Sequence, residues 1–393
     1  MLLQHVDLRP PLRAPPQPPP HGGRLKIAAV EALHLRVPQV ELKADGTQEV
    51  LLARITTDTG LVGHGEAVSN AAVVRAIVEA PRSMPFRHGL AAVLTGSDPL
   101  DPEARWRDMY DATRWYGRRG VAIHAMAAID TALWDIVGRH RGQPCHAVWG
   151  TRRRRVRAYA SVLFRDDAAA SAALAADLAA RGFTAIKFGW GRFGRDRAWD
   201  LAGLQSIRAA IGDGIDLMVD AGRIWTADEA LRRAPELFDR FRLLWLEEPL
   251  HEDDLAGYAR LAAAAPGWIA AGETEEREAD FAALLDRGVK VIQPDIGRAG
   301  GPTICRRLSA TAAARSVWCL PHSFGTGVNL AASAHWMAGA ETAPMMEYPV
   351  TESPLRNRLV TGIPRMQGGE VVVSDEPGLG IALDAETIAR YRV

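Results

Sequence analysis

Cysteine is scarce in this chain of 393 residues, which has only Cys145, Cys305 and Cys319 and no CxxC spacing. An odd number of thiols without paired spacing argues against a disulfide framework and against a thiolate zinc site. A reducing, cytoplasmic location is therefore expected. Net charge is missing as well, since 47 basic side chains balance 47 acidic ones. The chain lacks the basic surface typical of a nucleic-acid binder, and we expect no nucleic-acid partner.

Long hydrophobic runs are also absent. No stretch of 18 or more uninterrupted apolar residues offers a membrane span, so no membrane partner is expected. Hydrophobic residues make up 48% of the chain and charged residues 24%, which is typical of a soluble globular protein. The length exceeds one ordinary domain and suits a barrel of roughly 250 residues with a smaller partner domain. Residues 1–24 contain a proline run without the order of a signal peptide, which predicts a disordered leader.

Residues 25–150 combine short strands with helical periods. The runs LKIAAVEALHLRV and QEVLLARITTDTGLVGHGE predict a small antiparallel sheet. Further on, Ala125, Ile129 and Leu133 recur on one helix face, and Gly142 predicts the end of that helix. We therefore predict an α+β capping domain over 25–150.

Residues 151–355 alternate β-rich runs with alanine-rich helical stretches at a nearly constant interval. The eight runs are VRAYAS, AIKFGW, IDLMVDAG, LLWLEEP, GWIAAGE, VIQPDIG, VWCLPHS and MMEYP. Eight strand and helix units of this kind predict an α/β fold, a (β/α)₈ barrel with right-handed crossovers. Residues 356–393 return to strands and turns, and we expect them to pack back on the cap and complete it.

The predicted barrel strands from the second to the eighth each end in an ionisable residue. These residues are Lys187, Asp220, Glu247 with Glu248, Glu273, Asp295, His322 and Glu347. Because barrel chemistry lies at the C-terminal ends of the strands, they are expected to surround one mouth. A mouth with so many carboxylates needs a cation.

Three of these acids lie on consecutive strands. Asp220, Glu247 and Glu273 follow one another at intervals of 27 and 26 residues, which is one strand and helix unit each. Three oxygen ligands without cysteine or histidine suit Mg²⁺, the only cofactor that we predict. The alternative, in which the acids pair with arginines at a charged rim, explains their repeated position less well.

Asp295 and His322 also lie one unit apart, at the ends of strands six and seven. A carboxylate beside an imidazole sets its tautomer and supports its charged form, which makes the histidine a competent general base. An isolated histidine would more simply be structural, but the position and the partner of His322 favour catalysis.

In combination, LMVDAG, WLEEPL, AAGE, QPDIGRAGG, LPHSF and MMEYP resemble the barrel motifs of the enolase superfamily, mandelate racemase subgroup, and GLVGHGEA resembles its glycine-rich cap hairpin. The resemblance covers nearly the whole length. It implies a Mg²⁺ site of Asp220, Glu247 and Glu273 and a homo-oligomeric assembly. It also implies that His322 is the base and that Glu347 donates a hydrogen bond to the intermediate.

One departure from the family pattern bears on the reaction. Many members carry a KxK motif on the second strand, whose second lysine is a base opposite the histidine, but this chain has Lys187, Phe188 and Gly189 there. A racemase needs acid–base groups on both faces of the reacting carbon, so the missing lysine favours elimination. Arg192 or a cap residue is the alternative second base.

The sequence therefore predicts a lyase of the hydro-lyase type, a dehydratase of a sugar acid. His322 would remove the proton alpha to the carboxylate, Lys187 would add positive charge near that carboxylate, and Mg²⁺ would stabilise the enediolate. Loss of the β-hydroxyl would then give a 2-keto-3-deoxy acid. A racemase or epimerase of a carboxylic acid and a non-catalytic binding protein on the same fold are the alternatives. The cap loop at 38–47 and the rim near Trp190 and Tyr116 are expected to select the sugar acid.

Overall fold

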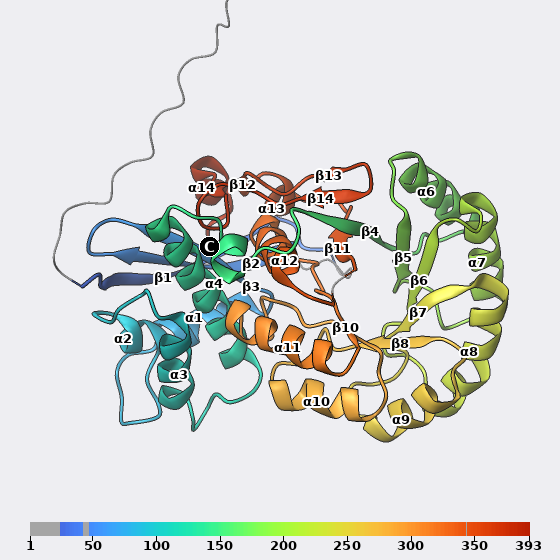
Figure 1. The fold of residues 1–393 in the computed structure, drawn as a ribbon, viewed down its shortest axis with the longest axis horizontal. Coiled ribbons are helices and arrows are strands. Elements are labelled where there is room, and N and C mark those ends of the chain that lie inside the picture. Colours follow the sequence, from blue (N-terminus) through green and yellow to red (C-terminus); the bar gives the residue numbers. More distant parts are fainter. Residues whose placement is uncertain (1–23, 42–46, 343) are drawn as a thin grey trace, which may run out of the picture.

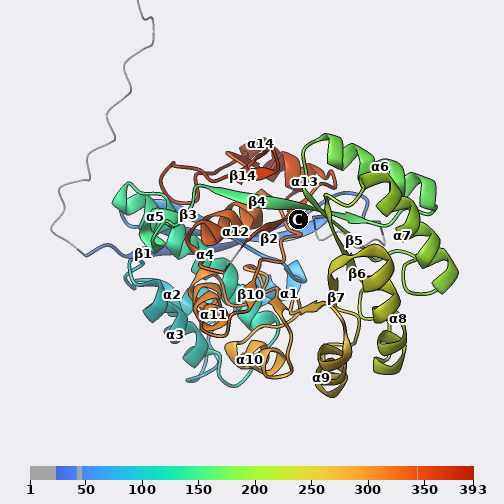
Figure 2. The ribbon, with the colours of Figure 1, turned by 45° about the vertical axis from the view of Figure 1, so that its right-hand side comes forward.

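The computed structural model describes residues 24–41, 47–342 and 344–393. The predicted leader, apart from Arg24, and residues 42–46 of the predicted cap loop lie outside the described residues. Two parts lie side by side, an N-terminal cap and a larger α/β part (Figures 1 and 2). Both parts agree with the predicted fold class, whereas the residue boundaries between domains stay a prediction.

The cap is a three-stranded antiparallel sheet packed against helices. Its elements are β1 (Ile27–Arg36), β2 (Glu49–Thr57), β3 (Val62–Ala67), α1 (Ala71–Glu79), α2 (Leu90–Leu94), α3 (Pro102–Ala112), α4 (Val121–Arg141) and α5 (Cys145–Trp149). Strand β3 lies directly on α4, and a Cβ added at Gly65 would be 1.9 Å from the carbonyl oxygen of Ala128. Helix α4 ends at Gly142, which adopts φ 61° as the predicted helix stop requires.

Helix α4 is long and apolar enough to cross a membrane by length and composition. In the fold, however, 83% of its most apolar window is buried. The cap sheet and neighbouring helices cover it, so it is the core helix of the cap.

The larger part contains the eight predicted strands in order, with helices between them. The strands are β4 (Arg155–Leu163), β5 (Ala185–Gly189), β6 (Asp216–Asp220), β7 (Leu243–Glu247), β8 (Trp268–Ala271), β9 (Val291–Ile292), β10 (Trp318–Cys319) and β11 (Met346–Pro349). The helices are α6 (Ala168–Ala180), α7 (Arg197–Ile211), α8 (Ala227–Phe241), α9 (Leu255–Ala264), α10 (Glu278–Asp286), α11 (Pro302–Ala314) and α12 (Gly327–Gly339). Strands β4 to β10 pair in parallel with their sequence neighbours, and β11 pairs in parallel with β4. Within the described ranges no ladder joins β10 to β11, so the ring of hydrogen bonds is open there.

The C-terminal segment contacts both parts. It consists of α13 (Pro354–Asn357), β12 (Val360–Thr361), β13 (Met366–Gln367), β14 (Glu370–Val372), β15 (Ala382–Leu383) and α14 (Ala385–Tyr391). Strand β14 pairs antiparallel with the start of β4, on the barrel. The backbone N–H of Leu379 donates to Asp135 of α4 at 2.8 Å, on the cap. The tail thus joins cap and barrel, rather than packing on the cap alone.

Two buried acids of the cap bind the start of barrel helices. Asp130 of α4 accepts from the backbone N–H and the hydroxyl of Thr303, both at 2.8 Å, at the N-terminus of α11. Glu66 of β3 accepts from the backbone N–H groups of Thr326 and Asn329 at 2.9 and 3.0 Å, at the N-terminus of α12. A carboxylate is favoured at a helix N-terminus because the first N–H groups lack intrahelical partners. Burial nevertheless raises the pKa of each acid to about 7.

We expect Asp130→Asn to change how stability depends on pH. Burial raises the pKa of Asp130 from 3.8 to about 7. Between these pH values the unfolded chain releases a proton that the folded protein keeps, so the wild type loses stability as pH rises through this window. The asparagine carries no such cost, and the stability difference should move in favour of the variant by on the order of 4 kcal/mol. Thermal and urea unfolding of both proteins between pH 4 and 8 measures this difference, and a constant difference would contradict the prediction.

Candidate active site

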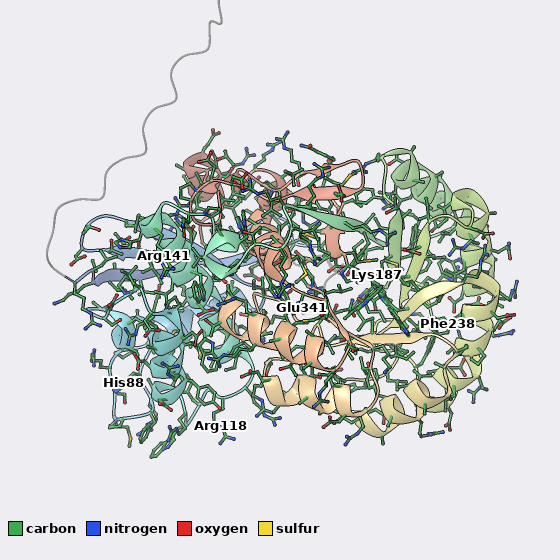
Figure 3. The ribbon with its side chains drawn as sticks, in the orientation of Figure 1. His88, Arg118, Arg141, Lys187, Phe238 and Glu341 are labelled. Carbon is green, nitrogen blue, oxygen red and sulfur yellow. The ribbon has the colours of Figure 1, made fainter. Side chains whose placement is uncertain are left out.

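A cavity of about 510 Å³ opens at the C-terminal ends of the barrel strands. The barrel supplies most of its wall, and Val68 and His124 of the cap supply another part. Figure 3 shows Lys187 within the barrel part, far from His88 and Arg118 at the edge of the cap. Of the predicted site residues, Lys187, Asp220, Glu273, His322 and Glu347 line the cavity. The mouth predicted from the strand ends is therefore a real concave site.

The three predicted metal ligands converge at one side of the cavity. Asp220, Glu247 and Glu273 each offer a carboxylate oxygen, and these oxygens all lie within 4.8 Å of one another. All three side chains are buried, with exposed fractions of 4%, 1% and 8%. Parallel pairing places Asp220 of β6 beside Glu247 of β7, which is why consecutive strands bring these acids together.

Two carboxylates of this triad, those of Asp220 and Glu247, are oriented by hydrogen bonds from neighbouring groups. The indole N–H of Trp190 donates to Asp220 Oδ2 at 2.8 Å. Glu247 Oε2 accepts from Trp245 at 2.9 Å and from Gln293 at 2.7 Å. The neighbour Glu248 accepts weakly from the backbone N–H groups of Gly272 and Glu273 at 3.2 and 3.3 Å, close to the third acid. The second oxygens of two of these acids are bonded as well, because Asp220 Oδ1 accepts from the backbone N–H of Gly222 at 2.8 Å and Glu247 Oε1 accepts from Lys187.

The electrostatics of the triad fit a divalent cation. Burial and the nearby charge of Glu247 raise the pKa of Asp220 to about 8. Lys187 donates to Glu247 and partly balances the negative charge. Buried carboxylates this close repel one another unless a cation lies between them, and an all-oxygen set is the type that Mg²⁺ prefers. Asp220, Glu247 and Glu273 are therefore the residues that can hold a metal ion.

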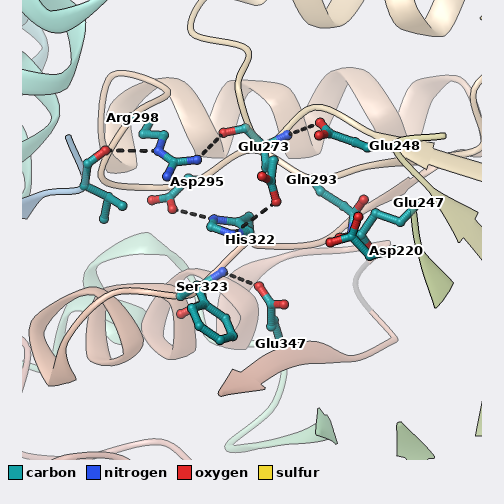
Figure 4. A network of polar contacts seen from close by, with 12 residues as sticks. Asp220, Glu247, Glu248, Glu273, Gln293, Asp295, Arg298, His322, Ser323 and Glu347 are labelled. Carbon is teal, nitrogen blue, oxygen red and sulfur yellow. Dashed lines mark hydrogen bonds and ion pairs between the residues drawn. The ribbon is translucent and has the colours of Figure 1, made fainter. Parts of the chain in front are cut away.

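His322 and Asp295 form a dyad beside the triad (Figure 4). His322 Nδ1 lies 2.6 Å from Asp295 Oδ2, and His322 Nε2 lies 3.2 Å from Glu273 Oε2. Because the carboxylate of Asp295 can only accept, Nδ1 carries the proton and Nε2 is the nitrogen that faces the cavity. Burial opposes the charged imidazole, but the carboxylates of Glu273, Glu347 and Asp295 raise the pKa of His322 to about 9. The surroundings thus stabilise the imidazolium that a general base becomes.

Glu347 and Lys187 face each other across the base of the cavity. Lys187 Nζ lies 2.9 Å from Glu347 Oε1, and the backbone N–H of Ser323 donates to Glu347 Oε2 at 2.6 Å. Burial tends to protonate Glu347, but the charges of Lys187 and His322 lower its pKa to about 2. Glu347 is therefore an ionised acceptor in this arrangement. The predicted hydrogen-bond donation from Glu347 would require a proton that this arrangement disfavours.

The position of the missing second lysine is closed. A Cβ added at Gly189 would lie 2.8 Å from the Cβ of Asp220 and 3.0 Å from its Oδ2. Trp190 follows with φ 59° and turns its indole onto the same aspartate. Arg192, the alternative second base, points elsewhere: its side chain is 55% exposed and lies 3.5 Å from Asp196. Tyr116, expected near the rim, donates to the backbone of His88 at 2.6 Å and does not line the cavity.

Sequence reasoning missed several residues of the cavity wall. His124 of α4 bonds to Ser69 at 2.8 Å and lies 3.4 Å from Glu276, which also accepts from the backbone of Gly120 at 2.6 Å. Arg298 bridges the backbone of Val68 in the cap and of Glu273 in the barrel, at 3.0 and 2.9 Å. The motif QPDIGRAGG contains Arg298, but nothing in its spacing indicates which carbonyls the arginine bonds.

Comparison with known families follows the same division of the chain. Residues 26–150 match the mandelate racemase / muconate lactonizing enzyme N-terminal domain, and residues 170–387 match the enolase C-terminal domain-like family. The chain belongs to the enolase superfamily. As a mandelate racemase/muconate lactonizing enzyme family member, it is an enzyme whose relatives act on sugar acids.

Named relatives of this superfamily member include cycloisomerases and dehydratases. D-galactarolactone cycloisomerase of Agrobacterium fabrum is 34% identical over 87% of this chain and 91% of its own length. Arabinonate dehydratase of Saccharolobus solfataricus is 29% identical over 89% of this chain and 92% of its own length. The crystal structure of 3,6-anhydro-D-galactonate cycloisomerase from Zobellia galactanivorans superposes with a TM-score of 0.84 at 29% identity, covering 94% of this chain and 99% of that one.

We expect Trp190→Phe to weaken metal binding. The substitution removes the N–H donor to Asp220 Oδ2 and keeps an aromatic ring beneath Arg223, whose guanidinium lies 5.2 Å from the indole. Loss of a hydrogen bond to a metal ligand typically costs about 10- to 100-fold in affinity. Calorimetric titration with MgCl₂ measures the change.

Trp225→Phe is the matched control for this measurement. The indole of Trp225 is buried nearby but donates to the backbone carbonyl of Gly194 at 2.9 Å, not to a triad residue. Its variant should bind Mg²⁺ as the wild type does. Equal affinity in all three proteins would contradict the assigned role of Trp190.

Proposed function

We propose that this enzyme is a Mg²⁺-dependent dehydratase of a sugar acid, which removes the proton alpha to the carboxylate and eliminates the β-hydroxyl. The observation that carries the proposal is that strand two offers no base opposite His322, because Gly189 stands at that position. His322 faces the cavity with Asp295 behind it, while the strand-two position that would supply an opposite base is Gly189, closed by Asp220. Inversion at the α-carbon needs an acid–base group on each of its two faces, whereas elimination needs such a group on one face.

The residues of the chain have distinct tasks in this reaction. Mg²⁺ held by Asp220, Glu247 and Glu273 would supply positive charge for the enediolate. Lys187, buried between Glu247 and Glu347, adds a fixed positive charge at the base of the cavity. The presence of the triad together with an intact dyad argues against a binding protein, since such a protein has no need for a buried general base.

His322 moves the proton in both halves of the reaction. Nε2 takes the α-proton, and the electrons of the broken C–H bond form the enediolate. The electrons then form a carbon–carbon double bond as the β-carbon–oxygen bond breaks. The imidazolium returns its proton to the leaving oxygen, so that water leaves and an enol remains. The enol tautomerises to the 2-keto-3-deoxy acid.

Cycloisomerisation is the second candidate, because two relatives at 34% and 31% identity are named as cycloisomerases. The same abstraction by His322 would then expel a β-oxygen that belongs to a ring of the substrate. The ring opens and no water is lost. Racemisation or epimerisation stays the weaker alternative, because strand two provides no second base at Gly189. His124, which also lines the cavity, is the cap residue left as an alternative second base.

A reducing cytoplasm suits the three cysteines, all of which are free and buried. We retain homo-oligomerisation, and the lack of a nucleic-acid or membrane partner, as predictions. The partner that matters for the reaction is a small carboxylate, a sugar acid.

His322→Asn should stop the reaction at its first step. Without Nε2 as a base, exchange of the substrate α-proton with deuterated solvent and product formation should both fall by about 10²- to 10⁴-fold. NMR in D₂O with MgCl₂ measures both on one sample. Calorimetry should show that the variant still binds Mg²⁺, and undiminished exchange would mean that another residue takes the proton.

A panel of sugar acids and their lactone or anhydro derivatives separates the candidate reactions. Mass spectrometry should find a product lighter by one water from an open-chain acid, whereas cycloisomerisation leaves the mass unchanged. Activity should disappear with chelator and return with Mg²⁺. Accumulation of an α-epimer without a keto acid would refute the dehydratase and favour the racemase.

A further inference from the structure

Glu66 of the cap hairpin binds the helix that follows the catalytic histidine. It is 2% exposed, and its carboxylate oxygens accept from Thr326 N at 2.9 Å and from Asn329 N at 3.0 Å. Glu66 packs closely against the backbone just before this helix, since a Cβ added at Gly325 would lie 2.6 Å from Glu66 Oε1. The start of α12 is therefore positioned by a side chain 260 residues earlier in the sequence.

Asn329 continues this contact to the dyad. Its Nδ2 donates to Asp295 Oδ1 at 2.9 Å, and its Oδ1 accepts from the Ser323 hydroxyl at 2.8 Å. The amide orientation is determined by chemistry, because an ionised carboxylate can only accept. Asn329 is 1% exposed and does not line the cavity. It thus acts on the reaction through Asp295 and Ser323 and not by touching substrate.

The residues that Asn329 holds lie on both sides of His322. Asp295 bonds to Nδ1 of the imidazole at 2.6 Å, and Ser323 directly follows the histidine in the chain. Asp295 Oδ1 also accepts from Gly297 N at 2.7 Å, in the loop that bonds the cap through Val68. The amide of Asn329 therefore links the end of strand six to the loop after strand seven. This loop carries His322, whose imidazole must keep its orientation to act as the general base.

We infer that Asn329 is a positioning residue for the His322–Asp295 dyad, and that Glu66 couples docking of the cap to the alignment of the base through α12. The inference rests on the proposed function for its kinetic part. A misplacement of about 1 Å at a reacting group can cost about 10²-fold in rate, so a small shift of α12 is enough to matter. Docking of the cap would then both close the cavity and orient the base.

Asp130 provides a matched control, because it makes the same kind of contact elsewhere. It is a fully buried cap carboxylate that binds the N-terminus of α11 through Thr303. No residue of α11 bonds to the dyad among the described residues. A purely structural role of cap docking predicts similar losses in Glu66→Gln and Asp130→Asn, whereas positioning predicts a loss in Glu66→Gln alone.

The experiment compares Glu66→Gln, Asn329→Asp and Asp130→Asn with the wild type, all loaded with Mg²⁺. Asn329→Asp keeps the side-chain shape but replaces the donor to Asp295 by a second carboxylate. We expect kcat to fall by about 10- to 100-fold in the first two variants, with KM and Mg²⁺ affinity little changed. Asp130→Asn should keep the wild-type kcat.

A double variant tests the coupling itself. Residues that act through one chain of contacts give non-additive effects. Glu66→Gln combined with Asn329→Asp should therefore be no slower than the slower single variant. Additive losses in this double variant would overturn the coupling through α12.

A readout without substrate separates this inference from the proposed function. The Nδ1 proton shared by His322 and Asp295 should give a strongly downfield proton NMR signal, assigned by its loss in His322→Asn. It should shift or broaden in Glu66→Gln and Asn329→Asp and persist in Asp130→Asn. Unchanged signals in the first two variants, or equal changes in all three, would overturn the inference.

The two proposals can fail separately. If the wild type converts no sugar acid, the proposed function fails while the NMR comparison still reports on the dyad. If Asn329→Asp does not fold, as thermal unfolding would show, Glu66→Gln and its NMR signal decide the result.

Discussion

Repulsion among carboxylates buried at one end of the barrel is the constraint on which the rest of the site depends. Carboxylate oxygens of Asp220, Glu247 and Glu273 lie within 4.8 Å of one another, and in the part of the chain that the structure describes Lys187 is the cation buried against them. Such a cluster is stable when positive charge enters it, which is why we propose that it holds a metal ion. The indole and amide donors around the triad hold the carboxylates of Asp220 and Glu247 in place.

The same electrostatic surroundings prepare the general base. Carboxylates near His322 favour its protonated form, which in the proposed reaction keeps the proton taken from substrate close to the reacting carbon. Because a Cβ at Gly189 would collide with Asp220, strand two supplies no base opposite His322 in that reaction. In the proposed reaction, the missing base on strand two directs the enediolate toward elimination. The leaving oxygen then determines whether water is lost or a substrate ring opens.

The cap contributes more than a wall. Glu66 and Asp130 are buried acids that bind the starts of two neighbouring barrel helices. Among the described residues, the helix bound by Glu66 carries a side chain that bonds to the dyad, and the helix bound by Asp130 does not. Burial raises the pKa of both acids, which means that docking costs free energy where they are ionised. The contact of Glu66 with α12 is the one that we propose to align His322. The cap would then take part in the reaction as well as cover the cavity.

The amino-acid sequence was enough to predict the strand order, the helix stop at Gly142 and the ionisable residues after barrel strands two to eight, because these follow from local periodicity and from one strand and helix unit per interval. It could not reveal that Glu347 is held ionised by Lys187, that Arg192 turns away from the cavity, or that the tail also pairs with β4. It also could not indicate that Glu66 reaches Asn329. Such contacts join residues far apart in the chain, and only the packing of cap on barrel brings their side chains within hydrogen-bonding distance.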